Sequence, residues 1–220
     1  GFDGVVIACV DFEDPEVSQL VASDIPVVTI DHIFNNRIAV MSDNVKGMRS
    51  LLQFIYHKGH RRIAYIHGEN HSAVTQKRLV GFYRACAAHG ITVPDTYIVP
   101  STYRDAKSCA VATRQLLALP QRPTAILFPD DFSAIGGIQT IREEGLLIPR
   151  DISVAGYDGN LISQIMSPQL TTYRQDTEAL GRAAAELLIE QIESPRTALP
   201  EQKLVSGSLL KGQSVDVPNL

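Results

Sequence analysis

Residues 123–158 read PTAILFPDDFSAIGGIQTIREEGLLIPRDISVAGYD, and this stretch decides the fold. It begins with a short apolar run, TAILFP, continues with a segment of helical period from 131 to 144, and ends with a second apolar run, ISVAGYD. Gly145 directly follows the helical segment, where a residue without a Cβ adopts the left-handed conformation at the least cost. This order predicts two parallel strands joined by a right-handed helical crossover.

The same alternation extends in both directions along the chain. Short apolar runs are followed by longer segments with apolar residues every three or four positions, and Gly59 and Gly90 end two of these segments as Gly145 does. The sequence therefore predicts an α/β fold with doubly wound parallel sheets. The predicted strands are 4–10, 26–31, 38–43, 62–68, 97–101, 124–129, 152–158, 170–173 and 203–210, and the predicted helices are about 44–58, 75–89, 105–119, 131–144 and 176–193.

Composition limits the class of protein. Of the 220 residues, 45% are hydrophobic and 20% are charged, which is typical of a globular chain. The net charge is −4 and no run of Lys or Arg forms a basic face, so this segment by itself is a poor candidate for binding DNA. No apolar stretch approaches the ~20 residues of a membrane-spanning helix, and no signal peptide precedes the first strand. We therefore expect a soluble, cytoplasmic protein, and the missing initiator Met leads us to expect an upstream segment.

Catalytic and metal-binding patterns are missing from the sequence. Cys9, Cys86 and Cys109 lie in apolar segments without CxxC spacing, so we expect buried free thiols. No set of His, Cys and carboxylate residues has the spacing of metal ligands, and no phosphate loop, nucleophile elbow or HExxH motif occurs. We expect no metal, no cofactor and no enzymatic activity.

Six stretches of the chain resemble one family in their order and spacing. These stretches, which cover nearly the whole chain, are IPVVTID, MSDNVKGM, GHRRIAYIHG, KRLVGFYRA, the stretch quoted above, and SPQLTTYRQDTEALGRAAAELL. Together they resemble the effector-binding core of the LacI/GalR transcriptional regulators. The resemblance implies a periplasmic-binding-protein-like fold of two lobes joined by three crossover strands, a homodimer, and a DNA-binding headpiece that this chain does not contain.

The resemblance also implies lobe boundaries. The N-terminal lobe would be incomplete and would comprise residues 1–57 and 174–200, and the C-terminal lobe would comprise residues 58–173 and 203–217. The operator DNA would be bound through an upstream helix-turn-helix.

Polar side chains follow the predicted strands at their carboxyl ends. In open parallel sheets these ends form the ligand-binding crevice, here expected between the lobes. Asn44 follows IAVMSD, Arg78 lies in the helix after IAYIHG, Asp130 follows AILFP, and Asp158 ends SVAGYD. Carboxylates accept hydrogen bonds from neighbouring hydroxyls and arginine donates through a planar fork, which suits a polyhydroxylated ligand such as a sugar.

The resemblance supports these four residues and adds two more. It places Tyr103 in the wall of the pocket and His71 in a loop that faces the cleft. The chain also departs from the family pattern, because Asp130 replaces the common Asn and Met48 replaces the second Gly of the DNxxGG motif. The extra acidic group leaves the exact ligand class open.

Structural roles remain alternatives for several candidates. Asn44 and Asp130 could cap the helices that they precede, and Asp158 could only stabilise a turn. Asp131 and Asp176 are interpreted as structural helix caps. The histidines near helix ends, His57, His60 and His89, are interpreted as solvent-exposed.

Two other functions share parts of this pattern. A periplasmic sugar-binding protein of a transport system would have the same fold and cleft, and a signal peptide upstream would indicate it. An enzyme acting on the bound sugar would show turnover and not only binding. The TTYRQD and GHRRI motifs favour a repressor that senses a small effector.

Overall fold

The computed structural model describes residues 1–8, 14–34, 37–194 and 201–219, which divide into two compact units. Unit 1 comprises Gly1–Asp43 and Asp176–Ser206, and unit 2 comprises Asn44–Gln175 and Gly207–Leu220. The chain passes between the units three times: after Asp43, after Gln175 and after Ser206. Both units are α/β, which confirms the predicted fold class.

Unit 1 is built on a four-stranded parallel sheet with the order β1-β2-β3-β9. Residues of α7 pack with β2 and β3 in one apolar core. The elements are β1 (Val5–Ile7), α1 (Pro15–Ala22), β2 (Val27–Ile30), β3 (Ile38–Ser42), α7 (Thr177–Glu193) and β9 (Gln202–Val205).

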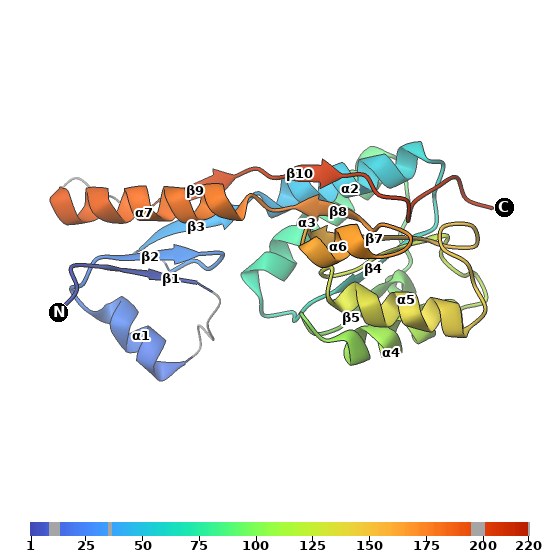
Figure 1. The fold of residues 1–220 in the computed structure, drawn as a ribbon, viewed down its shortest axis with the longest axis horizontal. Helices are drawn as coiled ribbons and strands as arrows, with labels where there is room; N and C mark the ends of the chain where they lie inside the picture. Colours follow the sequence, from blue (N-terminus) through green and yellow to red (C-terminus); the bar gives the residue numbers. More distant parts are fainter. Residues whose placement is uncertain (9–13, 35–36, 195–200, 220) are drawn as a thin grey trace. The chain divides into compact units, whose positions relative to one another are not determined.

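Unit 2 is built on a six-stranded sheet with the order β10-β8-β7-β6-β4-β5, in which only β10 is antiparallel to its neighbour. Figure 1 shows this sheet with its helices. The strands are β4 (Ile63–His67), β5 (Ile98–Pro100), β6 (Ala125–Leu127), β7 (Ser153–Asp158), β8 (Thr171–Arg174) and β10 (Ser208–Leu210). The helices are α2 (Asn44–His57), α3 (Ala73–Ala88), the 3-10 helix η1 (Asp95–Tyr97), α4 (Ala106–Leu117), α5 (Ser133–Glu143) and α6 (Leu161–Ile165).

The two faces of this sheet enter different cores. Ile63 and Tyr65 of β4 pack with residues of α2 and α3, whereas Ala64 and Ile66 pack with residues of α4 and α5. Successive side chains of a strand point to opposite faces, so a helix pair on each face buries every residue of the strand. This arrangement makes the sheet doubly wound, as predicted.

The predicted helix ends are confirmed by the backbone. Gly59, Gly90 and Gly145 have φ values of 103°, 65° and 73°, a region that L side chains rarely adopt. Each therefore stops its helix at the predicted position. Cys86 and Cys109 are buried free thiols, and burial raises the pKa of each to about 12. Cys9 lies outside the described residues.

The last predicted strand, 203–210, is in fact two strands. β9 pairs with β3 in unit 1, and β10 pairs with β8 in unit 2. The backbone of Gly207 between them lies against Arg174, where a Cβ would approach the carbonyl oxygen to 2.0 Å. A pattern of apolar residues cannot distinguish one long strand from two short strands in different sheets. The helix α2, expected in the first lobe, groups with unit 2, where it packs against α3.

His60 is buried, and the prediction that it is solvent-exposed is wrong. Its Nδ1 lies 2.8 Å from the hydroxyl of Thr124, and its Nε2 lies 2.7 Å from the carbonyl oxygen of Asp216. Burial lowers the pKa of His60, so the ring is neutral near pH 7. The histidine holds the C-terminal segment against the sheet through partners that are far away in sequence.

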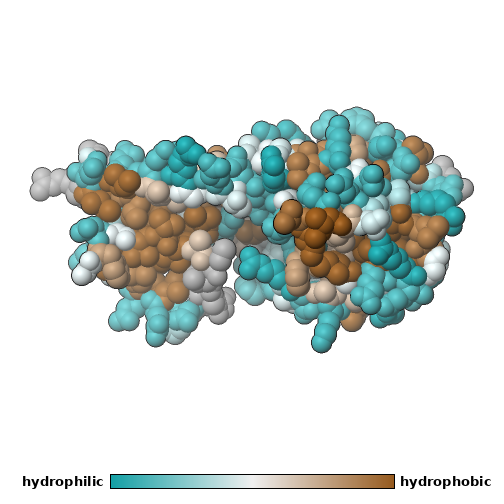
Figure 2. Space-filling model, viewed as in Figure 1, coloured by the Kyte–Doolittle hydropathy of each residue, from teal (hydrophilic) through white to brown (hydrophobic). Residues whose placement is uncertain are grey.

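Large apolar side chains remain exposed on both units, and Figure 2 shows the apolar surface on one face of each. In unit 1 they include Val6, Ile189 and Leu204. In unit 2, Leu161 and Ile165 lie four residues apart on α6 and are 77% and 73% exposed.

Candidate functional site

Arg78 lies at the centre of a polar cluster in unit 2. Its side chain comes from α3 and is 3% exposed. Its Nε donates to Oδ1 of Asn44 at 2.8 Å, its Nη1 donates to the carbonyl oxygen of Pro129 at 2.7 Å, and its Nη2 lies 3.5 Å from Oδ1 of Asp158. Burial alone lowers the pKa of Arg78, but Tyr103, Tyr157 and Asp158 raise it above its ordinary value. The guanidinium therefore stays charged in a buried position.

Aromatic rings cover both the guanidinium and the adjoining loop. The guanidinium carbon lies 3.5 Å from the ring centroid of Tyr157 and 5.7 Å from that of Tyr103. The hydroxyl of Tyr103 lies 2.8 Å from that of Thr75, and its ring rests on Gly68, where a Cβ would approach the ring to 2.1 Å. Cation–π contacts of this kind hold an arginine in one orientation.

Asn44 is the first residue of α2 and is buried. Its side-chain oxygen accepts a hydrogen bond from Arg78, so Asn44 belongs to the polar cluster around Arg78. The strand β3 ends two residues before Asn44, which is why the amide lies at the carboxyl end of a strand.

Asp158 ends β7 with a φ of 101°, in a region where non-glycine residues are strained. Its Oδ1 accepts from Nε2 of Gln175 at 2.7 Å and lies near Arg78. The side chain is 24% exposed, so it is the most accessible charged group beside Arg78. A ligand that reaches the cluster can therefore contact this carboxylate.

Asp130 takes the structural role at the start of α5 that the sequence left open as its alternative. Both oxygens of Asp130 are engaged within the protein: Oδ1 accepts from the backbone N–H of Ser133 at 2.7 Å, and Oδ2 accepts from the Ser133 hydroxyl at 2.7 Å and from the backbone N–H of Arg104 at 3.0 Å. Asp130 therefore ties the start of α5 to the loop that carries Tyr103. Its place in the pocket stays a prediction.

Asp131 does not cap α5, so its predicted role is wrong. Its carboxylate accepts from the hydroxyl of Thr172 at 2.6 Å and from the backbone N–H of Asn160 at 2.7 Å. It thereby fixes the loop after Asp158 to β8. Asp176, in contrast, accepts from the backbone N–H of Ala179 at 3.0 Å and caps α7 as predicted.

We expect Asp131 to make the stability of the protein depend on pH near neutrality. Burial raises its pKa to about 7, although the hydrogen bonds from Thr172 and Asn160 lower it. The unfolded chain releases this proton near pH 3.8, so the stabilisation from the protonated side chain is complete below that pH and is lost as pH rises towards about 7. The wild-type melting temperature should therefore fall between pH 5 and pH 8 relative to that of Asp131→Asn.

Thermal unfolding of both proteins at several pH values measures this difference. Asp151→Asn is the control, because the pKa of the Asp151 carboxylate is lowered by its hydrogen bond from Arg150 and the group stays ionised over the whole range. Parallel curves for wild type and Asp131→Asn would contradict the assignment.

His71 is exposed in the turn before α3. Within the part of the chain that the structure describes, no contact joins it to the Arg78 cluster. Its place in the pocket stays a prediction. The prediction from the sequence misses two residues of the cluster: Gln175, which contacts Asp158, and Tyr157, which contacts Arg78. Both lie at or just beyond the carboxyl end of a strand, so the rule that selected the other candidates could have found them.

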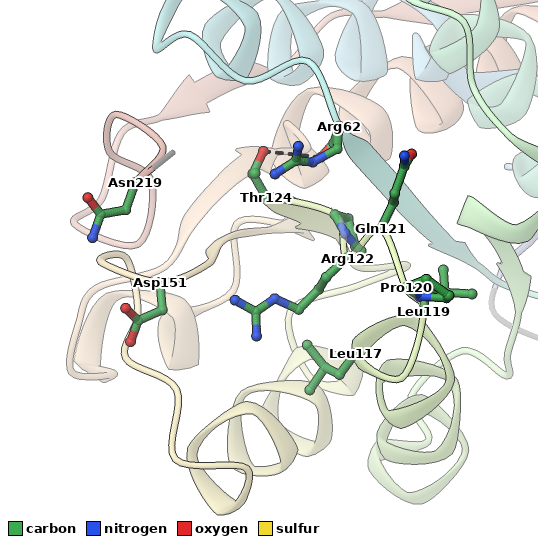
Figure 3. Close-up of a pocket in the computed structure, with 10 residues that line it drawn as sticks. Arg62, Leu117, Leu119, Pro120, Gln121, Arg122, Thr124, Asp151 and Asn219 are labelled. Carbon is green, nitrogen blue, oxygen red and sulfur yellow. Dashed lines mark hydrogen bonds between the residues drawn. The ribbon is translucent and has the colours of Figure 1, made fainter.

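A cavity of about 470 Å³ lies elsewhere in unit 2 (Figure 3). Arg62, Arg122, Asp151 and Asn219 surround its open space, and Arg62 and Thr124 immediately precede β4 and β6. This is the amino edge of the sheet, whereas the Arg78 cluster lies at the carboxyl edge. Ligands of open α/β sheets bind at the carboxyl ends of the strands, and the Arg78 cluster offers both charged donors and acceptors there. We therefore favour the Arg78 cluster over the cavity as the functional site.

The described residues contain no group of three or more His, Cys, Asp or Glu side chains that could hold a metal ion. Among the same residues, no helix has both the length and the apolar character needed to cross a membrane. The polar groups of the cluster can bind and orient a ligand through hydrogen bonds.

Two α/β units connected by three chain passages, with a buried arginine at the carboxyl edge of a parallel sheet, define a ligand-binding protein of the periplasmic-binding type. The family model for the periplasmic binding protein-like domain matches residues 52–215. The chain therefore belongs to this family.

The relatives confirm the resemblance to LacI-type regulators. The HTH-type transcriptional repressor PurR of Photobacterium profundum is 34% identical over 196 residues, which are 87% of this chain and 58% of the relative. The ribose operon repressor of Escherichia coli is 33% identical over 206 residues, which are 92% of this chain and 61% of the relative. The solved structure of a transcriptional regulator CelR–cellobiose complex is 27% identical, with a TM-score of 0.88 over 96% of this chain and 65% of that chain. The chain thus spans about three fifths of the length of the curated relatives.

Proposed function

We propose that this chain is the effector-sensing part of a cytoplasmic transcriptional repressor and that it binds a sugar or a related polar ligand at the Arg78 cluster. The buried guanidinium beside the partly exposed carboxylate of Asp158 carries this proposal. Together they present a donor and an acceptor to neighbouring hydroxyls, and Tyr103 offers a flat ring for an apolar sugar face. Asn44, Asp130 and His71 complete the proposed set of ligand-binding residues.

The names of the relatives support a sugar as the ligand class. One is a ribose operon repressor, and the solved structure of another relative holds cellobiose. All three relatives described above are transcriptional regulators, which favours a repressor over a transport protein or an enzyme.

DNA binding would come from a helix-turn-helix outside these 220 residues. The net charge of −4 makes this segment by itself a poor candidate for binding the phosphates of DNA. Ligand binding would shift the repressor between two states that differ in operator affinity, and such couplings are typically about 1–3 kcal/mol.

A homodimer fits this function. Leu161 and Ile165 on α6 form an exposed apolar pair, and a second copy of the chain would remove them from water. Paired subunits would present paired headpieces to an operator with two half-sites.

Thermal unfolding with a panel of sugars tests the proposal. We expect one of D-ribose, D-glucose and cellobiose to raise the melting temperature with increasing concentration. At a hundredfold excess over Kd the stabilisation is about 2.7 kcal/mol, which corresponds to about 5–10 °C for a chain of this size. The sugar should be recovered unchanged. A flat response to every sugar would contradict the proposal, and turnover would favour an enzyme.

A further inference from the structure

The hydroxyl of Tyr65 is a buried polar group without a hydrogen-bond partner among the described residues. Tyr65 lies on β4, and its side chain is 0% exposed. Its ring packs against Phe82 of α3, with centroids 5.4 Å apart. A phenylalanine would fill the same apolar space without burying a hydroxyl. Buried polar groups are normally hydrogen-bonded, so an unpaired hydroxyl at this position is unusual.

Three other tyrosines of unit 2, Tyr97, Tyr103 and Tyr173, have hydrogen-bond partners for their hydroxyls. Tyr97 donates to the carbonyl oxygen of Gln121 at 2.7 Å, and Tyr103 lies 2.8 Å from the hydroxyl of Thr75. The hydroxyl of Tyr173 accepts from the backbone N–H of Gly207 at 2.9 Å. The lack of a protein partner is therefore not a general property of tyrosines in this core.

The surroundings of the Tyr65 hydroxyl are those of the candidate site. It interacts electrostatically with Tyr103, Arg78, Tyr157 and Asp130. Burial raises the pKa of Tyr65 well above its ordinary value, so the hydroxyl keeps its proton and can donate. Phe82, against which the Tyr65 ring packs, lies on the same helix as Arg78, so the orphaned donor lies near the polar cluster.

We propose that the Tyr65 hydroxyl forms the floor of the ligand site and donates a hydrogen bond to a bound sugar. Tyr65 is then a specificity-determining residue, because a ligand oxygen at that depth satisfies a group that the protein leaves unpaired. A site built to pair with a ligand hydroxyl discriminates strongly against an analogue that lacks it. This inference rests on the proposed function.

Tyr65→Phe tests the role of the hydroxyl in the full chain. The probe is whichever of D-ribose, D-glucose and cellobiose stabilises the wild-type protein most. Without sugar, the melting temperature of Tyr65→Phe should equal or exceed that of the wild type, because no hydrogen bond within the protein is lost. Its Kd for the probe should rise about tenfold, the effect of removing one hydrogen bond to a ligand.

Tyr97→Phe is the matched control, because it removes a buried hydroxyl that does have a partner. Its melting temperature should fall by about 2–4 °C while its Kd stays unchanged. A sugar-free melting temperature of Tyr65→Phe that falls as that of Tyr97→Phe does would overturn the inference, because the hydroxyl would then be satisfied inside the protein. An unchanged Kd for Tyr65→Phe would also overturn it. Failure of the proposed function would instead appear as a wild-type protein that no sugar stabilises, and it would remove the basis of this inference as well.

Discussion

Replacement of Arg78 by alanine is expected to abolish sugar-dependent stabilisation and to lower the melting temperature of the free protein. The guanidinium has partners on Asn44, Pro129 and Asp158, so its loss leaves buried acceptors unpaired. We expect the free energy of unfolding to fall by about 2–3 kcal/mol, which lowers the melting temperature by about 5–10 °C. The Kd for a sugar should rise more than about a hundredfold, because charge-assisted hydrogen bonds are lost together with the geometry of the site.

Thermal unfolding and calorimetric titration measure these two effects separately. Arg114→Ala is the control, because this arginine is half-exposed and its ion pairs with Glu143 and Glu144 lie on the surface. Surface pairs contribute little, so its melting temperature should change by only a few degrees and its affinity not at all. A Kd for Arg78→Ala within threefold of that of the wild type would show that the ligand binds elsewhere.

Asp158→Asn is expected to weaken sugar binding strongly while leaving the protein folded. Asparagine keeps the shape of the side chain and tolerates a positive φ better than most residues, so the backbone at 101° should be retained. Its oxygen can still accept from Gln175, and only the charge is lost. We expect the Kd to rise about tenfold to a hundredfold, since hydrogen bonds to charged groups contribute about 1.5–3 kcal/mol.

Circular dichroism establishes that the variant is folded, and calorimetric titration gives its Kd. Asp151→Asn changes a partly exposed carboxylate at the other edge of the sheet and should bind sugar normally. If Asp158→Asn and Asp151→Asn bound sugar equally well, the carboxylate of Asp158 would have no role in recognition.

Much of the fold could be predicted because local signals agree with the final structure. Strand length, helical period and the glycines after helices indicate the doubly wound sheet, and these signals depend on neighbouring residues only. The rule that ligands bind at the carboxyl ends of strands also brought Asn44, Arg78 and Asp158 together correctly, with Tyr103 beside them. Strand direction alone fixes which edge of the sheet these residues share.

Other features depend on contacts that sequence patterns do not carry. Asp130 and Asp131 are adjacent and chemically identical, and only the path of the turn decides that one caps α5 while the other reaches Thr172. His60 is buried because its ring hydrogen-bonds to the hydroxyl of Thr124 and donates to the carbonyl oxygen of Asp216, both far away in the chain. The role of the Tyr65 hydroxyl could not be predicted, because the sequence of its strand is that of an ordinary buried strand.

A crystal structure of the chain with the most stabilising sugar of the panel tests the central claim most directly. We predict that the sugar lies beside Arg78, with its hydroxyls hydrogen-bonded to the guanidinium and to the carboxylate of Asp158. A sugar bound instead in the cavity lined by Arg62 and Arg122, with the Arg78 cluster unchanged, would contradict the account.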